Sequence, residues 1–360
     1  MKIFAINPGS TSTKIALFDG AECLWTDTQR YDIDVIGQFK TIIDQEQFRY
    51  DEIIKVLDAR EVSPKDFAAV VGRGGLMKPI KSGVYHVNAA MLEDLRSTKY
   101  GAHASNLGAP LAARFAAACN SGTAAQISAF IVDPVVVDEL VDEARFSGLP
   151  EMPRVSIFHA LNQKAVARRA ASELKKNISD CNLIVAHMGG GVSVGAHERG
   201  RVIDVNNALD GEGPMSPERS GSLPTGALVT MCFSGKYTFP EIRNMINGKG
   251  GFVAHLGTND LREVEKRIAD GDAQASLVFK AMALQVAKEI GRCAAVLKGE
   301  VDAIALTGGL AYSDKLCERI TSRISFIARV LRYPGEDEME ALAHGVLRVL
   351  RGEESASQYE

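Results

Sequence analysis

Two stretches of the chain decide the fold. Residues 1–20 are MKIFAINPGSTSTKIALFDG, and residues 181–200 are CNLIVAHMGGGVSVGAHERG. They align without a gap at an offset of 180 residues, which places Gly9 over Gly189. In each stretch a short apolar run, a turn of small residues, an alternating run and a tight turn follow one another, as in strands joined by hairpins. The repeat is either a chance likeness of two hairpins or an internal duplication of an α/β unit, and we favour the duplication.

The length and composition indicate a globular protein with more than one domain. The chain has 360 residues, whereas one domain usually has roughly 100–200. Hydrophobic residues make up 46% and charged residues 24%, and the net charge of −4 leaves no basic field for nucleic acid or an anionic membrane. We therefore expect a small-molecule partner, with no nucleic acid and no membrane among the partners.

The N-terminal and cysteine patterns favour the cytoplasm. Only four apolar residues, Ile3 to Ile6, precede the first turn, which is too few for a signal-peptide core. No run of the sequence has the length of a membrane span. The six cysteines contain no Cys-x-x-Cys pair, so neither a zinc site nor a disulfide framework is indicated. We expect reduced, mostly buried thiols in a cytoplasmic protein.

Helical and strand patterns alternate along the rest of the chain. Apolar residues recur at helical spacing over residues 35–56, 107–118, 165–174, 277–297 and 339–350, and short buried strands are predicted at 68–71, 127–132 and 301–306. The loop at residues 148–153 is the best candidate for a domain boundary because Gly and Pro break it. The sequence therefore predicts an α/β fold class with two domains and mixed sheets.

Three turns of small residues follow buried strands and are candidates for phosphate binding. They are residues 7–14, 187–193 and 307–309. Walker-type and Gly-x-Gly-x-x-Gly fingerprints are absent from the sequence. Backbone N–H groups in such turns bind anions where no Cβ obstructs them. One turn alone is a weak signal, but three at strand ends suit a polyphosphate gripped from both sides of an interdomain cleft.

These motifs resemble those of the acetokinase family, within the superfamily of actin, chaperone ATPases and sugar kinases. NPGSTSTK at residues 7–14 is similar to the family's opening signature, and AHMGGGVSVGAHERG at 186–200 to its second. Further matches lie at residues 72–75, 158–162, 217–221 and 305–309, so the resemblance covers nearly the whole chain.

The resemblance implies two duplicated ribonuclease-H-like domains of the actin-like ATPase type, with the active site in the interdomain cleft. It also implies that the last helix returns to the first domain. The expected N-terminal domain is then residues 1–150 plus about 339–360, and the nucleotide-binding domain is residues 151–338. By family resemblance we also expect a homodimer or a higher homo-oligomer.

The implied reaction is reversible, in-line phosphoryl transfer from ATP to a short-chain carboxylate, with Mg²⁺. Such an acid is ionised at neutral pH, so no general base is needed and cations must neutralise the phosphoryl group. Residues 103–110 resemble the butyrate kinases of the family rather than its acetate kinases. Butyrate is therefore the expected acid. Since one methylene group contributes only about 1–3 kcal/mol to the discrimination between two acids, related acids are poorly separated. Acetate, propionate and isobutyrate remain alternatives, as does an ATP-hydrolysing chaperone or filament protein.

The resemblance implies four catalytic residues. Arg73 is expected to bind the carboxylate and the transition state, and Arg219 to bind the transferring phosphoryl group. His159 opens a helix, where a neutral ring donates a hydrogen bond, and Asp133 orients Mg²⁺ waters or an arginine. Without the family, Arg73, Arg219 and His159 would be read as ordinary turn, surface or capping residues, while Asp133 would be read equally well as a plain turn aspartate or as a functional residue.

The remaining expected contacts are to ATP and to Mg²⁺. Residues expected to bind the phosphates are Asn7, Gly9, Ser10, Ser12, Thr13, Lys14, His187, Gly189, Gly190, Gly191, Gly308 and Gly309. Asn7, Asp133 and Glu338 are expected near Mg²⁺, mostly through water and phosphate. Glu336 remains an alternative to Glu338, and a core histidine remains an alternative for His187.

Overall fold

The computed structural model describes residues 1–120 and 127–360 as two compact units. Unit 1 is Met1–Val137 with Asp337–Glu360, and unit 2 is Asp138–Glu336. The first segment of unit 1 ends 13 residues before the expected limit at residue 150 (150 − 137). Unit 2 ends 2 residues before the expected limit at residue 338 (338 − 336).

Unit 1 is built on a six-stranded sheet with the order β3-β2-β1-β4-β6-β5. The strands are β1 (Lys2–Pro8), β2 (Ser12–Asp19), β3 (Glu22–Arg30), β4 (Phe67–Arg73), β5 (Val84–His86) and β6 (Ser128–Val132). The strands β1, β2 and β3 form two successive antiparallel hairpins, while β4 and β6 run parallel to β1.

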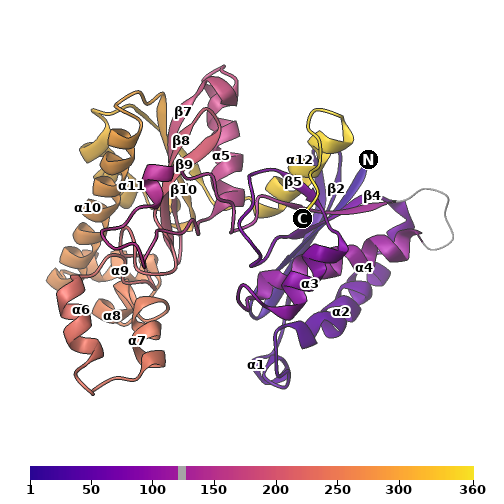
Figure 1. Ribbon diagram of the computed structural model, residues 1–360, viewed down its shortest axis with the longest axis horizontal. Helices are drawn as coiled ribbons and strands as arrows, with labels where there is room; N and C mark the ends of the chain where they lie inside the picture. The colour runs from indigo at the N-terminus through magenta and orange to yellow at the C-terminus, as the bar shows by residue number, and fades with distance from the viewer. Residues whose placement is uncertain (121–126) are drawn as a thin grey trace. The chain divides into compact units, whose positions relative to one another are not determined.

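Helices cover both faces of this sheet. They are α1 (Ile33–Ile36), α2 (Glu46–Ala59), α3 (Ala89–Ser97), α4 (Gly108–Asn120) and α12 (Glu338–Leu350). Phe4 and Ile6 point to one face, where they form a core with residues of α2 and α4 such as Ile53 and Phe115. The helix α12 packs on β1, β4 and β6, and the C-terminus lies in unit 1 (Figure 1).

Unit 2 repeats the arrangement with a five-stranded sheet of the order β11-β10-β7-β8-β9. The strands are β7 (Asn182–Met188), β8 (Val192–Glu198), β9 (Arg201–Val205), β10 (Ala303–Gly308) and β11 (Arg329–Pro334). As in unit 1, two hairpins are followed by two strands parallel to the first strand. The repeated connectivity confirms the α/β fold class with duplicated domains and mixed sheets.

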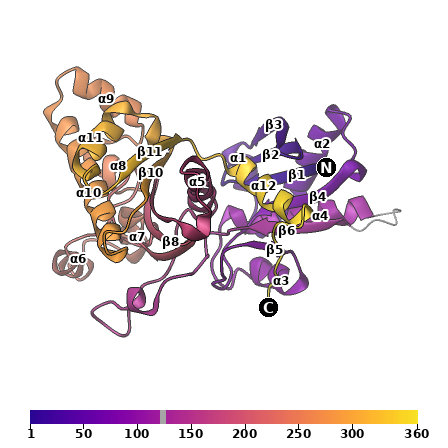
Figure 2. The ribbon, with the colours of Figure 1, turned by 90° about the horizontal axis from the view of Figure 1, so that it is seen from above.

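The helices of unit 2 also lie on both faces of its sheet (Figure 2). They are α5 (Ala160–Glu173), α6 (Thr225–Cys232), α7 (Phe239–Ile246), α8 (Gly251–Leu256), α9 (Leu261–Ala269), α10 (Ala273–Val296) and α11 (Asp314–Ile324). Ile184 and Ala186 pack with α10 and α11, whereas Leu183 and Val185 pack with α5. This alternation along β7 is that of a strand buried on both faces.

The gap-free alignment of the two hairpins is wrong by one residue after the turn. Pro8 pairs with Thr13, which leaves four residues in the first turn, whereas Met188 pairs with Val192 and leaves three. Each residue of β2 therefore corresponds to a residue of β8 one place earlier than the alignment predicts. The second turn consists of three glycines, Gly189 to Gly191.

The helical pattern predicted over residues 35–56 is two helices rather than one. The first, α1, ends at Ile36, and α2 begins at Glu46 after a short 3₁₀ turn. Between them, the Thr41 N–H donates to the Asp44 carboxylate, and the Asp44 N–H faces the Thr41 hydroxyl. This reciprocal pair starts a new helix, as a capping box does. The other predicted helices and strands are present, with ends shifted by a few residues.

The cysteines are unpaired and mostly buried, as expected. All six cysteines are free, and four of them are buried, while Cys23 and Cys232 are exposed. In the described parts of the chain, no helix combines the length and the apolar character needed to cross a membrane.

A buried arginine holds the turn between β1 and β2. Arg49 of α2 is fully buried, and its guanidinium donates to the backbone carbonyls of Gly9, Ser10 and Ser12 at 2.8–3.0 Å. It also donates to the side-chain oxygen of Gln45. The turn therefore has its carbonyls directed inward onto one cation.

Arg49→Met is expected to destabilise the protein by at least about 3 kcal/mol, because three carbonyls lose a buried donor at about 1–3 kcal/mol each. Urea denaturation followed by circular dichroism measures the change. The matched control is Arg96→Met, which removes a surface ion pair with Glu46 and should cost no more than about 1 kcal/mol. Equal losses in the two variants would contradict the role given to Arg49.

Candidate active site

The ends of three parallel strands form the functional edge of the unit 1 sheet. Since β1, β4 and β6 are neighbours and parallel, their carboxyl ends lie side by side. In open α/β sheets ligands bind at this edge. Asn7 lies near the end of β1, Arg73 ends β4 and Asp133 follows β6, so the sheet brings three predicted site residues to one edge.

Arg73 forms a cluster with Glu338 and Asn7. Its Nη1 and Nη2 lie 3.0 and 2.9 Å from the two carboxylate oxygens of Glu338, which is a bidentate pair. The Asn7 amide donates to the same carboxylate at 2.6 Å, and its oxygen accepts from Arg73 at 3.3 Å. Of the two glutamates left open by the sequence, Glu338 lies in this cluster, and Glu336 belongs to unit 2.

The glycines beside Arg73 let its turn pack closely on the start of α4. A Cβ at Gly72 would overlap the backbone of Gly108, and a Cβ at Gly75 would lie 2.6 Å from Cα of Asn106. Asn106 is itself buried, and its side chain accepts from the backbone N–H of Leu76. Arg73 therefore stands on a closely packed turn beside residues 103–110, the segment that resembles the butyrate kinases.

Asp133 fixes a loop at the same edge. Its carboxylate accepts from the Ser82 hydroxyl at 2.6 Å and from the Gly83 N–H at 2.8 Å. The side chain is buried. These bonds give Asp133 a structural task, and its expected part in orienting Mg²⁺ waters or an arginine stays a prediction.

The first turn exposes only some of its predicted phosphate-binding side chains. Ser10 and Lys14 are exposed, and Gly9 and Ser12 are half-buried. Thr13 is fully buried, and its hydroxyl accepts from Arg49 at 3.1 Å. The Thr13 side chain therefore belongs to the support beneath the turn.

The strand ends of unit 2 form the equivalent edge. The strands β7, β10 and β11 are parallel neighbours, which brings His187, Gly308 and the segment after Pro334 together. Gly308 and Gly335 exchange two backbone hydrogen bonds of 3.0 and 3.1 Å. The turn that contains Gly308 is thereby tied to the segment that carries Glu336.

Two predicted histidines stack on one another at this edge. The rings of His159 and His187 lie 3.8 Å apart at an interplanar angle of 13°. His187 Nδ1 lies 2.7 Å from the amide oxygen of Asn162, which only accepts, so Nδ1 carries the proton. The Asn162 amide nitrogen donates to the backbone oxygen of Glu336 at 2.8 Å.

A chain of hydrogen bonds behind His159 was not foreseen from the sequence. His159 Nδ1 lies 2.9 Å from the hydroxyl of Ser193, which also accepts from Gln163 at 2.8 Å. The Gln163 oxygen in turn faces Nε2 of His197 at 3.0 Å. His197 is fully buried, and burial holds its pKa well below the usual 6.5, with positive charge on Lys164 acting in the same direction.

Arg219 lies directly on the turn between β7 and β8. A Cβ at Gly191 would overlap its guanidinium, so a larger residue there would displace the Arg219 side chain. Nη1 donates to the backbone oxygen of Ala208 at 2.6 Å, and Nε donates to Asn247 at 3.1 Å. Burial lowers the pKa of Arg219 from its ordinary value, although an arginine stays protonated in proteins. Nη2 has no hydrogen-bond partner among the described residues.

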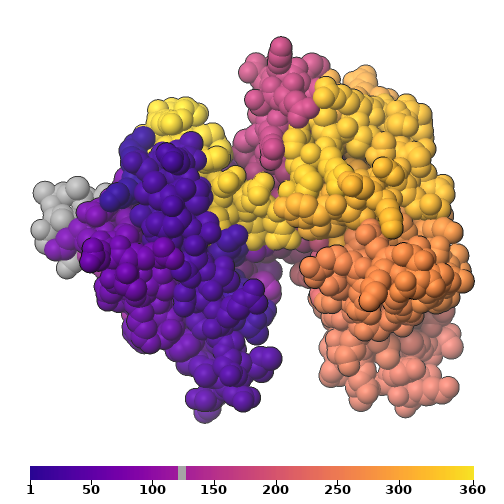
Figure 3. Space-filling view, turned by 180° about the vertical axis from the view of Figure 1, so that it is seen from behind, coloured from indigo at the N-terminus to yellow at the C-terminus, as the bar shows by residue number. Residues whose placement is uncertain are grey.

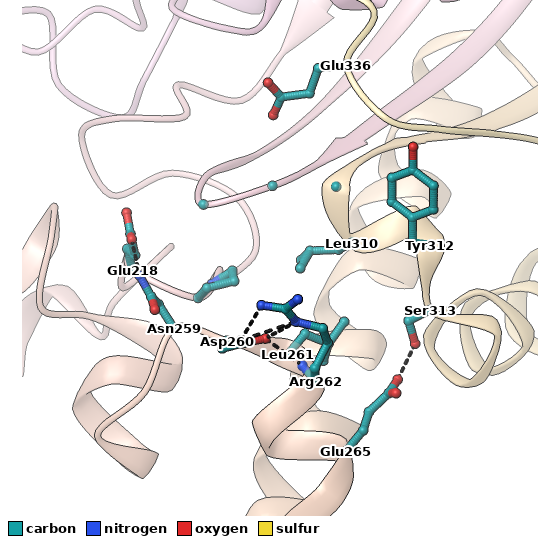
Figure 4. Close-up of a pocket in the computed structure, with 14 residues that line it drawn as sticks. Glu218, Asn259, Asp260, Leu261, Arg262, Glu265, Leu310, Tyr312, Ser313 and Glu336 are labelled. Atoms are coloured by element: carbon teal, nitrogen blue, oxygen red, sulfur yellow. Dashed lines mark hydrogen bonds and ion pairs between the residues drawn. The ribbon is translucent and has the colours of Figure 1, made fainter. Parts of the chain in front are cut away.

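A pocket of about 820 Å³ opens beside this turn (Figure 4). Of the residues expected to bind ATP, Gly189, Gly190 and Gly309 line it. Its volume lies within the range of small-molecule sites, about 300–1,000 Å³. The structure thus joins the second and third glycine turns in one pocket of unit 2.

The start of α9 supplies pocket residues that the sequence analysis missed. Asn259, Asp260 and Arg262 line the pocket there, and Tyr312 lines it from the 3₁₀ turn before α11 (Figure 4). Asp260 caps α9 by accepting from the backbone N–H of Arg262 at 2.9 Å. Hydrogen bonds from the Arg262 side chain and backbone lower the pKa of Asp260 to about 2. An Asp followed by an amphipathic helix is a capping signal in the sequence, but capping alone does not indicate a ligand.

His197→Gln is expected to reduce the pH dependence of stability. Unfolded His197 binds a proton below about pH 6.5, while the buried ring resists it, so the free energy of unfolding falls as pH decreases, by up to about 1.4 kcal/mol per pH unit. Urea denaturation at several values between about pH 7.5 and 5 measures the slope. His255→Gln, which removes an exposed histidine of α8, is the matched control. An unchanged slope in His197→Gln would contradict the assignment.

Comparisons with known proteins agree on one family. A family model described as the acetokinase family matches residues 154–328. Butyrate kinase 2 of Clostridium acetobutylicum is 56% identical over 358 residues, and butyrate kinase 1 of the same organism is 54% identical over 358 residues. Each alignment covers 99% of this chain and 99% of the relative.

Solved structures confirm the fold. The acetate kinase of Porphyromonas gingivalis has a TM-score of 0.77 at 20% identity, and the alignment covers 97% of this chain and 99% of that one. A propionate kinase from Francisella tularensis has a TM-score of 0.72 at 19% identity, with 96% and 98% covered. Together with the two full-length relatives, these findings show that the chain belongs to the acetokinase family of carboxylate kinases.

Proposed function

We propose that this chain transfers the γ-phosphoryl group of ATP to butyrate, reversibly, giving butyryl phosphate and ADP. The observation that carries the choice of acid is the 56% identity to a butyrate kinase over 99% of both chains. The geometry supports the reaction type, because unit 1 carries a guanidinium fork and unit 2 carries a glycine-lined pocket.

On the nucleotide side, we assign ATP to the pocket of unit 2. The glycine turns at Gly189–Gly190 and Gly309 offer backbone without Cβ obstruction, which suits phosphate. Arg219 lies against Gly191 and keeps Nη2 unbonded by described residues, so it is placed to neutralise charge on the transferring phosphoryl group. His187, held by Asn162, is a further candidate contact to the phosphates.

On the acid side, we assign the carboxylate to Arg73. The ionised carboxylate oxygen forms a bond to the γ-phosphorus as the bond from that phosphorus to the β–γ bridging oxygen breaks, and ADP leaves with the electron pair. No proton moves in this step, so positioning and charge neutralisation supply the catalysis. His159, oriented by Ser193, is assigned to donate a hydrogen bond to the transferring group.

The residues present fit a magnesium ion that binds mainly to phosphates. Mg²⁺ usually takes one or two protein oxygens and keeps water and phosphate oxygens for the rest. Glu338 and Asn7 supply such oxygens at one point, and the described residues contain no cluster of three or more metal-binding His, Cys, Asp or Glu side chains. The bound ion would neutralise charge on the phosphate oxygens.

Assembly and location are proposed on separate grounds. The helix α6 contains no buried residue, although Val229 within it and Phe233 after it are large, exposed and apolar. A short apolar helix is marginal in water unless something covers it, which supports a homodimer or higher homo-oligomer. The free cysteines support the reducing cytoplasm.

A hydroxamate assay for acyl phosphate over a series of acids tests the function. With ATP and Mg²⁺, butyrate is expected to give the highest kcat/KM. Propionate, which is one methylene shorter, should be about 10–200-fold lower, and the branched isomer isobutyrate should also be lower. ATP hydrolysis that does not depend on any acid would favour the rival, a chaperone or filament ATPase. A preference for acetate would keep the carboxylate kinase and reject butyrate.

Arg73→Gln and Arg73→Lys are both expected to lower kcat/KM for butyrate by about 10²–10³, because a bidentate clamp on developing charge is lost. Affinity for a fluorescent ADP analogue should stay within about twofold of wild type. Arg60→Gln is the control, since it removes an exposed pair with Asp27 in the same unit. Lost ADP affinity with unchanged kinetics for the acid would contradict the assignment.

A further inference from the structure

A second cavity of about 660 Å³ lies in unit 2 among α9, α10 and α11. Its apolar lining is Ile268 at the end of α9 and Phe279 of α10. Parts of α9, in orange, and α11, toward yellow, are exposed on the face of unit 2 seen in Figure 3. The cavity shares no lining residue with the nucleotide pocket.

Four cationic side chains surround this cavity. Lys315, Arg319 and Arg323 follow one another at intervals of four residues along α11, so they share one side of that helix. Lys280 approaches from α10. Glu318 is the one carboxylate in the lining, which leaves a formal charge of +3 (4 − 1).

The described residues do not neutralise these cations. Across residues 1–120 and 127–360, none of the four makes an ion pair within 4.0 Å. Arg319 Nε is also buried and has no hydrogen-bond acceptor. Like charges at a spacing of four residues repel, and a buried donor without an acceptor is costly. An anion in the cavity would offset the repulsion among these cations.

We propose that this cavity binds a small organic polyanion that carries at least two phosphate groups. Four cations against one carboxylate suit a ligand with several negative charges, since a single carboxylate would leave most of the positive charge unpaired. The apolar lining leaves room for a carbon skeleton between the charged groups. The site is separate from the proposed nucleotide pocket, so it goes beyond the kinase reaction.

Isothermal titration of the full chain with fructose 1,6-bisphosphate tests the proposal, with the nucleotide pocket first saturated by a non-hydrolysable ATP analogue. One saturable site is expected, and its affinity should fall with added salt. Fructose, which has the skeleton without the charge, should not bind. Absence of saturable binding, or equal binding of fructose, would overturn the proposal.

A pair of matched variants locates the site. Lys280→Gln with Lys315→Gln should raise Kd for the bisphosphate at least tenfold, and both side chains are exposed, so the fold should persist. Lys236→Gln with Lys288→Gln removes the same charge from exposed lysines outside the cavity and should leave Kd within about twofold. An equal loss in both pairs would show a diffuse charge effect and reject this cavity as the site.

Discussion

The parallel pairing of one central strand with the next strand on one side decides where chemistry can occur in each unit. In unit 1 this strand is β1, and in unit 2 it is β7. Parallel neighbours end at the same edge of a sheet, so polar residues far apart in the sequence meet there. Arg73 and Glu338 are 265 residues apart and form a bidentate pair because their segments reach one edge.

Each hairpin turn packs against an arginine, but the two arginines differ in how many of their N–H groups remain unbonded. Arg49 is fully buried and is engaged by three turn carbonyls and by Gln45, so it is confined to support. Arg219 is half-buried and has two side-chain bonds, with Nη2 unbonded by described residues. Duplication of the fold has therefore not duplicated the chemistry, and Arg219 rather than Arg49 is suited to meet a ligand.

Local patterns could be predicted from the sequence because strands and turns depend on neighbouring residues. The hairpins, the three glycine turns and the final helix are of this kind. Contacts between distant residues were reached only through family resemblance, as with Arg73, or were missed, as with Arg49 and the Gln163–His197 bond. The one-residue difference between the turns was also missed, since small residues fit either length. Which distant residues touch depends on where their side chains point, and that direction is set by packing in the folded protein.

The proposed reaction uses functional groups from both units. Unit 1 contributes a guanidinium already in bidentate geometry with a carboxylate, and unit 2 contributes glycine turns, Arg219 and the pocket. A carboxylate and a polyphosphate are both anionic, so a single cation cannot neutralise both reactants and the developing charge between them. We therefore assign one cation of each unit to this task, Arg73 of unit 1 and Arg219 of unit 2. In unit 1 the half-buried guanidinium of Arg73 is paired with Glu338, because a guanidinium without an anion would be costly there.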